Sequence, residues 1–490
     1  MDSMAGDEVT HATIIFPVVL VLLVAFLVRV QQRQSDLTRI PTVGPSRFPL
    51  SYIGAVQFLF HAERLLQEGY QHYKPSAFKV ARFTRWIVVI TGPRLVEELR
   101  KAPEDEMSYD ATTDSKELTS TGIHVDIGHI APLSTHLTRN LPLMFSEMRD
   151  EMVTAIGDAM PNVSATVSAI DASTEIFSRV CNRILVGLEV CRSPEMTVLN
   201  KQFLEGKARG KAILSALPMY LFIALRGRVN RVRSLIEPMI AQKPEDFGMF
   251  GKEYPHGILS SLIAADSSNP KASRHIADAI LALNAHAIPA LSLTFTHALY
   301  HLATASPSDV VQPMREEVEA AVGRGGWTPS ALERMRRIDS FLKESMRVSG
   351  LHALTMLRKS RTDYTFSDGT HVPKGTILAV ACAATHADPS KYPSPQTFDA
   401  FRFVQGSGQA ASRYQLSTTA PDFLGWGYGR AACPGRFVAA VQMKMVLAHL
   451  VLHYDVRLED GAGDVRPRDW WVGSERLPDL SARLMFKKRR

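Results

Sequence analysis

One cysteine loop constrains the fold of this chain more than any other feature of its sequence. The segment WGYGRAACPGRFVAA, residues 426–440, places Cys433 between glycines and the start of an apolar helical stretch. Glycine lets a backbone pass close to a flat cofactor. A cysteine just before a helix N-terminus has its negative charge stabilised by N–H groups and the helix dipole. A lone cysteine is more often a buried structural residue, but this loop favours a thiolate ligand to iron.

The loop resembles the cysteine loop of the cytochrome P450 family, and it is most similar to a fungal form written FGYGRHACPGRFFA. The resemblance implies haem b as the cofactor, with Cys433 as the axial thiolate ligand to its iron. Gly429 and Gly435 fall on the glycines of the motif. The fold implied is mainly α with a minor β-sheet, the cytochrome P450 fold, preceded by a single N-terminal transmembrane helix.

Two positions of the loop depart from the family pattern. Trp426 replaces the usual phenylalanine beside the sulfur, and Ala431 replaces a histidine or arginine that would meet a haem propionate. Arg430 is the predicted substitute for that contact. The resemblance also places Arg358, and from an earlier helix Arg139, among the cofactor-binding residues. The alternative for both is an exposed arginine without such a role.

A second motif supports the same family. Glu344 and Arg347 share one face of the predicted helix FLKESMRV, and Arg402 follows in TFDAFRF. An ExxR pair alone is usually an exposed ion pair of little energetic value. The resemblance implies instead that the three residues lock the loop behind Cys433, which is a structural role. His386, in the HADP segment before that loop, is expected to cap or pack rather than react.

The long apolar segment HIADAILALNAHAIPALSLTFTHALYHLA, residues 275–303, predicts a buried helix. In the family this helix carries an oxygen-activating acid and threonine, but Pro289 and Ala290 stand at those positions here. Proline removes the hydrogen bond to the carbonyl of Ala285 and kinks a helix. Our hypothesis is that water held at this carbonyl delivers protons to oxygen, with Ser292 as a further candidate.

The side chains around Pro289 predict an apolar distal pocket. His286 is a weaker candidate for proton transfer, because a buried histidine bonded to the backbone is the simpler interpretation. An apolar pocket with few polar groups suits an apolar small molecule. The residues expected to line it are Ala287, Ile288, Ala290 and Leu291.

The predicted activity is insertion of one oxygen atom from O2 into an apolar small molecule, a terpenoid or similar secondary metabolite. The resemblance implies electrons from NADPH–cytochrome P450 reductase. Loss of the acid–threonine pair leaves three alternatives open: a haem-thiolate isomerase or dehydratase, a peroxygenase, and a haem-binding protein without turnover.

The N-terminus predicts a membrane anchor. Residues 12–28 read ATIIFPVVLVLLVAFLV, with acidic residues before them and Arg29, Arg33 and Arg39 after them. This length is just sufficient to cross a bilayer, and the positive-inside rule places the rest of the chain in the cytosol. The predicted organisation is a lumenal segment 1–11, an anchor 12–30, a Pro-rich hinge 31–50 and a catalytic domain 51–490. The resemblance implies the endoplasmic reticulum membrane.

Composition agrees with a large folded domain. The chain has 490 residues, of which 46% are hydrophobic, and this is enough apolar material for a large core. Its four cysteines are sparse, so neither a disulfide scaffold nor a zinc site is indicated. The net charge of +7 is spread along the chain and predicts no nucleic-acid partner. Two short strands, 78–81 and 86–90, precede the long helical region 130–350.

Overall fold

The structure is a computed structural model, and it describes most of the chain. The predicted anchor, residues 12–30, lies outside the described residues. The chain divides into two compact units, residues 1–112 with 356–381 and residues 113–355 with 382–490. The described residues are 37–47, 49–83, 85–109, 123, 130–213, 219–241, 272–404, 414–459 and 465–489.

The first unit contains the larger sheet. Its five strands have the order β1-β2-β8-β5-β3, in which β1 and β2 are antiparallel and β2 and β8 are parallel. The two strands predicted at 78–81 and 86–90 are confirmed as β1 and β2, and every residue of both is buried. The elements of this unit are α2 (Ser51–Tyr73), β1 (Ala77–Ala81), β2 (Trp86–Ile90), α3 (Pro93–Lys101), β3 (Met107–Ser108), β5 (Leu354–Ser360), β6 (Tyr364–Thr365), β7 (His371–Val372) and β8 (Ile377–Ala381).

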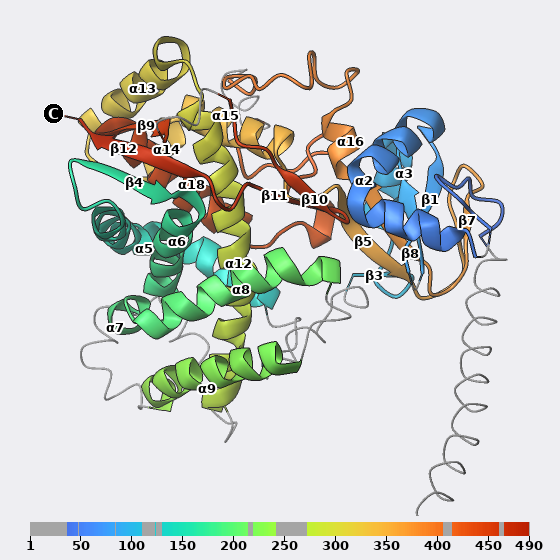
Figure 1. Cartoon of the computed structure of the whole chain (residues 1–490), viewed down its shortest axis with the longest axis horizontal. Helices are drawn as coiled ribbons and strands as arrows, with labels where there is room; N and C mark the ends of the chain where they lie inside the picture. Colours follow the sequence, from blue (N-terminus) through green and yellow to red (C-terminus); the bar gives the residue numbers. More distant parts are fainter. Residues whose placement is uncertain are drawn as a thin grey trace, which may run out of the picture. The chain divides into compact units, whose positions relative to one another are not determined.

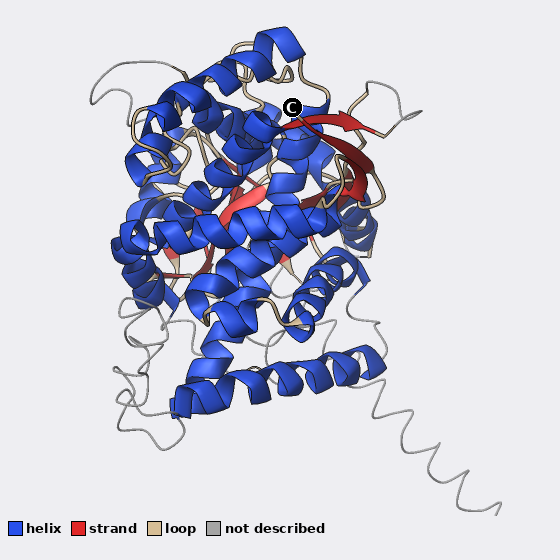
Figure 2. Ribbon diagram, turned by 90° about the vertical axis from the view of Figure 1, so that its left-hand side faces the viewer, coloured by secondary structure: helices blue, strands red, loops and turns tan. Residues whose placement is uncertain are grey.

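The second unit is mostly helical, as the sequence predicts (Figures 1 and 2). Its minor sheets are β4-β12-β9, which is antiparallel throughout, and the hairpin β10-β11. The helices are α5 (Ile130–Ala159), α6 (Ala169–Leu185), α7 (Leu188–Cys191), α8 (Pro194–Ile213), α9 (Met219–Ala241), α12 (Ala272–Ala303), α13 (Gln312–Gly323), α14 (Pro329–Arg334), α15 (Arg336–Val348), α16 (Cys382–His386) and α18 (Arg436–His453), and the strands are β4 (Ser164–Ser168), β9 (Tyr454–Leu458), β10 (Trp470–Val472), β11 (Glu475–Leu477) and β12 (Arg483–Lys488).

Helix α12 is the centre of the second unit. It packs against α6, α8, α9 and α15, so apolar residues are needed on nearly every side of it. Phe295 of α12 meets Phe177 of α6 edge to face, with ring centroids 5.2 Å apart. The amide of Asn284 donates to Asn182 Oδ1 (2.8 Å), which satisfies polar groups inside this contact. The predicted buried helix over residues 275–303 is therefore confirmed, with its start at Ala272.

Two described helices, α12 and α18, are long and apolar enough to span a membrane. Both are mostly buried within the protein, α12 by 72% and α18 by 61% over their most apolar stretches. Their apolar composition is therefore explained by the core of the second unit.

Candidate functional site

The cysteine loop ends in the helix that the sequence predicts. Helix α18 begins at Arg436, with Gly435 as its N-cap, so Cys433 lies just before the helix N-terminus. The N–H of Cys433 donates to the carbonyl of Trp426 (2.7 Å), and this bond closes the loop. Gly429 has a φ of +81°, which a side chain would strain. Gly435 has a φ of −82°, so its backbone conformation does not itself require glycine.

Opposing effects act on the Cys433 thiol. Burial raises its pKa above the ordinary value, because a thiolate loses its solvation there. The backbone N–H groups of Gly435 and Arg436, and the charge of Arg436, act in the opposite direction. These are the groups expected around a sulfur that carries negative charge. A metal cation at the sulfur would complete the stabilisation, because a coordinated thiol is deprotonated.

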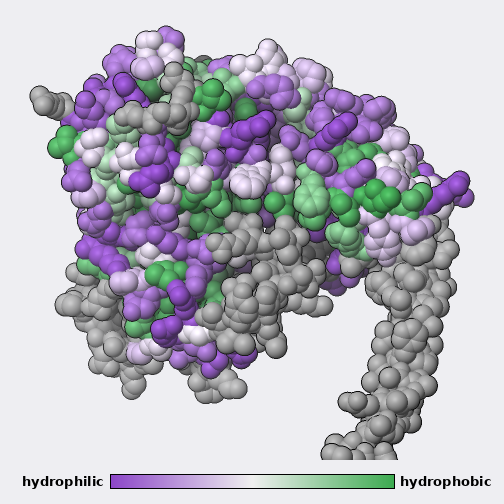
Figure 3. Space-filling view, in the orientation of Figure 1, coloured by the Kyte–Doolittle hydropathy of each residue, from purple (hydrophilic) through white to green (hydrophobic). Residues whose placement is uncertain are grey.

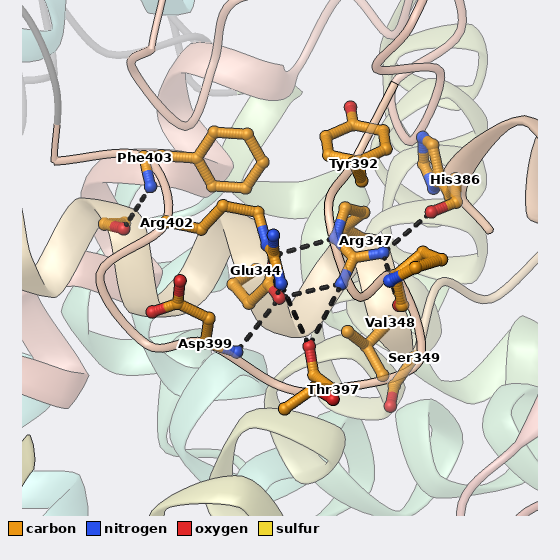
Figure 4. A network of polar contacts seen from close by, with 12 residues as sticks. Glu344, Arg347, Val348, Ser349, His386, Tyr392, Thr397, Asp399, Arg402 and Phe403 are labelled. Carbon is orange, nitrogen blue, oxygen red and sulfur yellow. Dashed lines mark hydrogen bonds and ion pairs between the residues drawn. The ribbon is translucent and has the colours of Figure 1, made fainter. Parts of the chain in front are cut away.

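The motif residues Glu344, Arg347 and Arg402 meet in one buried network (Figure 4). Glu344 accepts from Arg347 Nε and Nη2, both at 2.8 Å, and from Arg402 Nε at 3.0 Å. Its side chain is completely buried, and that of Arg347 is 1% exposed. The arginines also donate to backbone carbonyls, Arg347 to that of Pro395 (2.8 Å) and Arg402 to that of Pro393 (2.7 Å). The alternative of an exposed ion pair is therefore wrong.

His386 extends this network toward the cysteine loop. Its carbonyl accepts from Arg347 Nη1 (2.7 Å), and its ring Nε2 accepts from the N–H of Leu424 (2.9 Å). Burial, with the nearby charge of Arg347, lowers the pKa of His386 to about 3, so the ring is neutral. Leu424 lies two residues before Trp426, where the cysteine loop begins. The expected packing role of His386 is thus seen as a hydrogen bond at the base of the loop.

Helix α15 holds the other side of the loop through residues that sequence reasoning missed. Asp339 accepts from the N–H of Leu416 (2.5 Å) and from Lys444 Nζ of α18 (2.6 Å). Trp426 Nε1 donates to the carbonyl of Leu416 (2.7 Å), so the departure from phenylalanine adds a hydrogen bond. Asp339, Lys343 and Arg347 recur at helical spacing in the sequence, and this polar stripe was the available signal.

Helix α12 has one accessible face, and Ser292 is not on it. Ser292 is fully buried, and its hydroxyl donates to the carbonyl of Ile288 (2.7 Å). Ala287, Ala290 and Thr294 are partly accessible and recur at helical spacing. The hydroxyl of Thr294 has no hydrogen-bond partner in the described part of the chain, and this residue was not predicted.

The remaining predicted residues of this helix divide between core and surface. Ile288 and Leu291 are buried in the core, so they do not share the accessible face of Ala287 and Ala290. Pro289 is also buried, and α12 continues through it. Nδ1 of His286 forms the expected hydrogen bond with a backbone carbonyl, that of Ala282 (2.8 Å). The His286 side chain is exposed, however, so the expectation that it is buried is wrong.

The predicted propionate arginines lie in different environments. Arg358 is buried in β5 of the first unit, with its guanidinium 5.6 Å from the ring centre of Tyr109. Arg139 is exposed on α5, and Arg430 is exposed in the cysteine loop. Their cofactor contacts stay predictions.

The residues of the cysteine loop fit a thiolate-ligated haem. The donor set is one cysteine sulfur, with two backbone N–H groups directed at it. The loop that carries it is held by hydrogen bonds at Trp426 and Leu424. A sulfur held in a fixed loop, with N–H groups that support a thiolate once a metal is bound, suits a permanent axial ligand.

Comparison with known proteins agrees with this geometry. The family model for cytochrome P450 matches residues 45–479. Cytochrome P450 monooxygenase 103 of Postia placenta is 35% identical, over 96% of this chain and 97% of its own. Cytochrome P450 monooxygenase CYP512U6 of Ganoderma lucidum is 31% identical over 99% and 97%. Ent-kaurene oxidase P450-4 of Gibberella fujikuroi is 32% identical over 93% of each chain.

The fold also has a solved counterpart. Retinoic acid-bound cyanobacterial CYP120A1 superposes with a TM-score of 0.70, covering 92% of this chain and 99% of that one. Its sequence is 20% identical, so the likeness concerns the fold alone.

Proposed function

Because the chain belongs to the cytochrome P450 family and is a monooxygenase of that family, we propose that it oxidises an apolar small molecule of the terpenoid class at a membrane. The observation that carries the proposal is the cysteine loop at the start of α18, with the buried Glu344 network behind it. The family cofactor is haem b with a cysteine thiolate ligand, and we assign that ligand to Cys433.

The overall reaction consumes O2, NADPH, a proton and the substrate, and it yields the hydroxylated product, water and NADP⁺. When bound, the haem supplies cleavage of the O–O bond, which the thiolate ligand favours. The chain's own residues hold Cys433, and the N–H groups of Gly435 and Arg436 would support a negative charge on its sulfur when the haem is bound. Glu344, Arg347 and Arg402 hold the backbone behind the loop, and this supports a fixed position for the sulfur.

The accessible face of α12 supports an apolar substrate. Leu283, Ala287 and Ala290 are partly accessible on this face and offer no hydrogen bond from their side chains, and the polar side chains beside them are His286 and Thr294. The relative from Gibberella fujikuroi is an ent-kaurene oxidase, and ent-kaurene is a terpenoid hydrocarbon. Both observations favour a terpenoid scaffold over a charged or strongly polar substrate.

Two features support membrane association. The uncharged run 12–28 is long enough to span a bilayer. Helix α2, which follows it in the sequence, exposes Ile53 by 51% and Phe60 by 63%, with Leu50 beside them at 52%. Apolar side chains lie at the surface in the region of α2 (Figure 3). Exposed apolar side chains of this size favour contact with lipid. We propose the cytosolic face of the endoplasmic reticulum, where the net charge of +7 also suits an acidic NADPH–cytochrome P450 reductase.

We assign proton delivery to helix α12. Pro289 has no N–H to offer the carbonyl of Ala285, which is therefore available to water. The hydroxyl of Thr294 lies on the accessible face and has no partner among the described residues, whereas Ser292 is buried and its hydroxyl donates within the helix. Thr294 thus takes the role first considered for Ser292, while water at the carbonyl of Ala285, nine residues earlier and about 180° around the helix, would be a separate route.

This assignment predicts that NADPH oxidation is uncoupled from product formation in two variants. Thr294→Val removes the hydroxyl at nearly constant volume. Pro289→Ala restores a backbone N–H at residue 289, which can donate to the carbonyl of Ala285. Product formation should fall by about 10²-fold in Thr294→Val, and less in Pro289→Ala, while NADPH oxidation continues and releases hydrogen peroxide. The measurement is the ratio of product to NADPH consumed.

Ser292→Ala is the matched control for this pair. It also removes a hydroxyl from α12, but from its buried side, so coupling should not change. Unchanged coupling in both Thr294→Val and Pro289→Ala would exclude this route for protons.

The activity itself is tested with the full chain and a reductase. We expect NADPH-dependent products from a panel of terpenoid hydrocarbons, each with one added oxygen detected by mass spectrometry. With ¹⁸O2 the added oxygen should carry the label. Unlabelled products formed without NADPH would instead identify an isomerase or dehydratase, and products formed only with peroxide would identify a peroxygenase. Absence of both product and NADPH consumption would point to a haem-binding protein without turnover.

A further inference from the structure

A cavity of about 450 Å³ lies in the second unit, where the end of α12 meets the end of α15. Its walls also include Gln396, Phe398 and Ala400, together with two arginines, Arg466 and Arg476, from the C-terminal part of the chain. The described residues that line it include none from the cysteine loop and none from the accessible face of α12. Val348 and Ser349, which line the cavity, lie beside the Glu344 network (Figure 4).

The lining of this cavity carries excess positive charge. Arg466 Nη1 and Arg476 Nε both pair with one carboxylate, Asp469, at 2.9 and 2.8 Å. Burial lowers the pKa of both His297 and His301, and the nearby arginines lower it further, so neither adds charge at neutral pH. Two guanidinium groups therefore face a single buried carboxylate. Asp309, next in sequence to the lining residue Val310, is exposed and accepts from the hydroxyls of Ser306 and Ser308.

The two arginines retain hydrogen-bond donors that the described residues do not use. The terminal nitrogens of Arg466 donate to Asp469, to the carbonyl of Pro467, to His297 and to Ser349, while its Nε is buried without a hydrogen-bond partner among the described residues. Arg476 Nη1 donates to the carbonyl of Val348, and no described residue accepts from its Nη2. A guanidinium with free donors and unbalanced charge binds a carboxylate in its own plane.

Another part of the lining is apolar. Phe398 stacks on His301, with ring centroids 4.1 Å apart and planes inclined by 8°. Val310 and Val348 also line the cavity. A ligand that satisfies both walls needs one negative charge and an apolar body. Inorganic phosphate would satisfy the arginines but leave the apolar wall uncovered.

We propose that this cavity is a second ligand site, which binds a small monocarboxylate with its carboxylate on Arg466 and Arg476 and its apolar body against Phe398. The site is independent of the proposed substrate pocket on α12. A carboxylate bound here ties the end of α12 to the end of α15 and to β11.

The probe is benzoate, titrated by calorimetry into the full-length, haem-loaded protein. Benzamide, its neutral analogue, and inorganic phosphate, which lacks the apolar body, should each bind at least about tenfold more weakly. The haem absorption spectrum, followed in the same titration, should not change. Equal affinity for benzoate and benzamide would overturn the proposal, because the arginines would then contribute nothing.

Three variants locate the binding. Arg476→Gln should weaken benzoate binding by about tenfold or more. Arg324→Gln, which removes a charge from an exposed position in the same unit, should not change it. Ala305→Phe fills the cavity without altering a charge and should abolish binding, so the test remains informative if Arg476→Gln does not fold. Wild-type affinity in either Arg476→Gln or Ala305→Phe would place benzoate elsewhere and refute the site.

Discussion

Replacement of Cys433 by serine is expected to reduce monooxygenase activity to background and to remove the carbon monoxide difference band typical of a thiolate-ligated haem. A hydroxyl placed at the start of α18 would meet the same N–H groups of Gly435 and Arg436. A serine hydroxyl, however, stays protonated where a cysteine becomes a thiolate, so the electron donation that favours O–O cleavage is lost. The measurements are product formation with reductase and the reduced, carbon monoxide-bound absorption spectrum.

Cys181→Ser is the matched control for this variant. Cys181 is a buried, free cysteine on α6 whose sulfur donates to Gln442 Oε1 (3.4 Å), a hydrogen bond that serine can retain. Burial raises the pKa of its thiol to about 12, so it is not suited to be a ligand at neutral pH. We expect this variant to keep both the spectrum and the activity. A thiolate-type spectrum retained by Cys433→Ser would show that another residue ligates the iron.

The features that the sequence predicts correctly are those that depend on residues close together in the chain. The cysteine loop, the helix after it and the long helix α12 all follow from patterns within one segment. The Glu344, Arg347 and Arg402 network was predicted because a family resemblance supplied the long-range partner. Without that resemblance, the ExxR spacing alone would have indicated an exposed ion pair.

The features that were missed join segments distant in the sequence. His386 reaches Leu424, and Asp339 reaches Leu416, through loops whose path no local pattern fixes. The buried position of Ser292, in contrast, depends only on local geometry, because an α-helix places it about 200° around the axis from Ala290. Thr294 falls within about 40° of Ala290, so the accessible hydroxyl was deducible from periodicity alone.

The buried network gives the largest expected effect on stability. Glu344→Gln keeps the shape of the side chain but leaves Arg347 and Arg402 without their counter-charge. Because Arg347 is 1% exposed, water cannot replace the carboxylate. Breaking one partner of a buried pair costs about 3–5 kcal/mol, a large part of the roughly 5–15 kcal/mol that stabilises a typical protein. We expect a lower urea midpoint by far-UV circular dichroism and less haem bound per chain.

Glu97→Gln is the control for Glu344→Gln, because it removes a carboxylate from an exposed ion pair rather than from a buried one. Glu97 and Arg100 have the same i,i+3 spacing and an N–O distance of 2.6 Å, but their side chains are 34% and 29% exposed. Water solvates either charge when its partner is removed, so the change should be about 0–1 kcal/mol. A Glu344→Gln variant as stable as Glu97→Gln would mean that the motif does not stabilise the loop through charge. In that event the arginines would act through their bonds to the carbonyls of Pro393 and Pro395 alone.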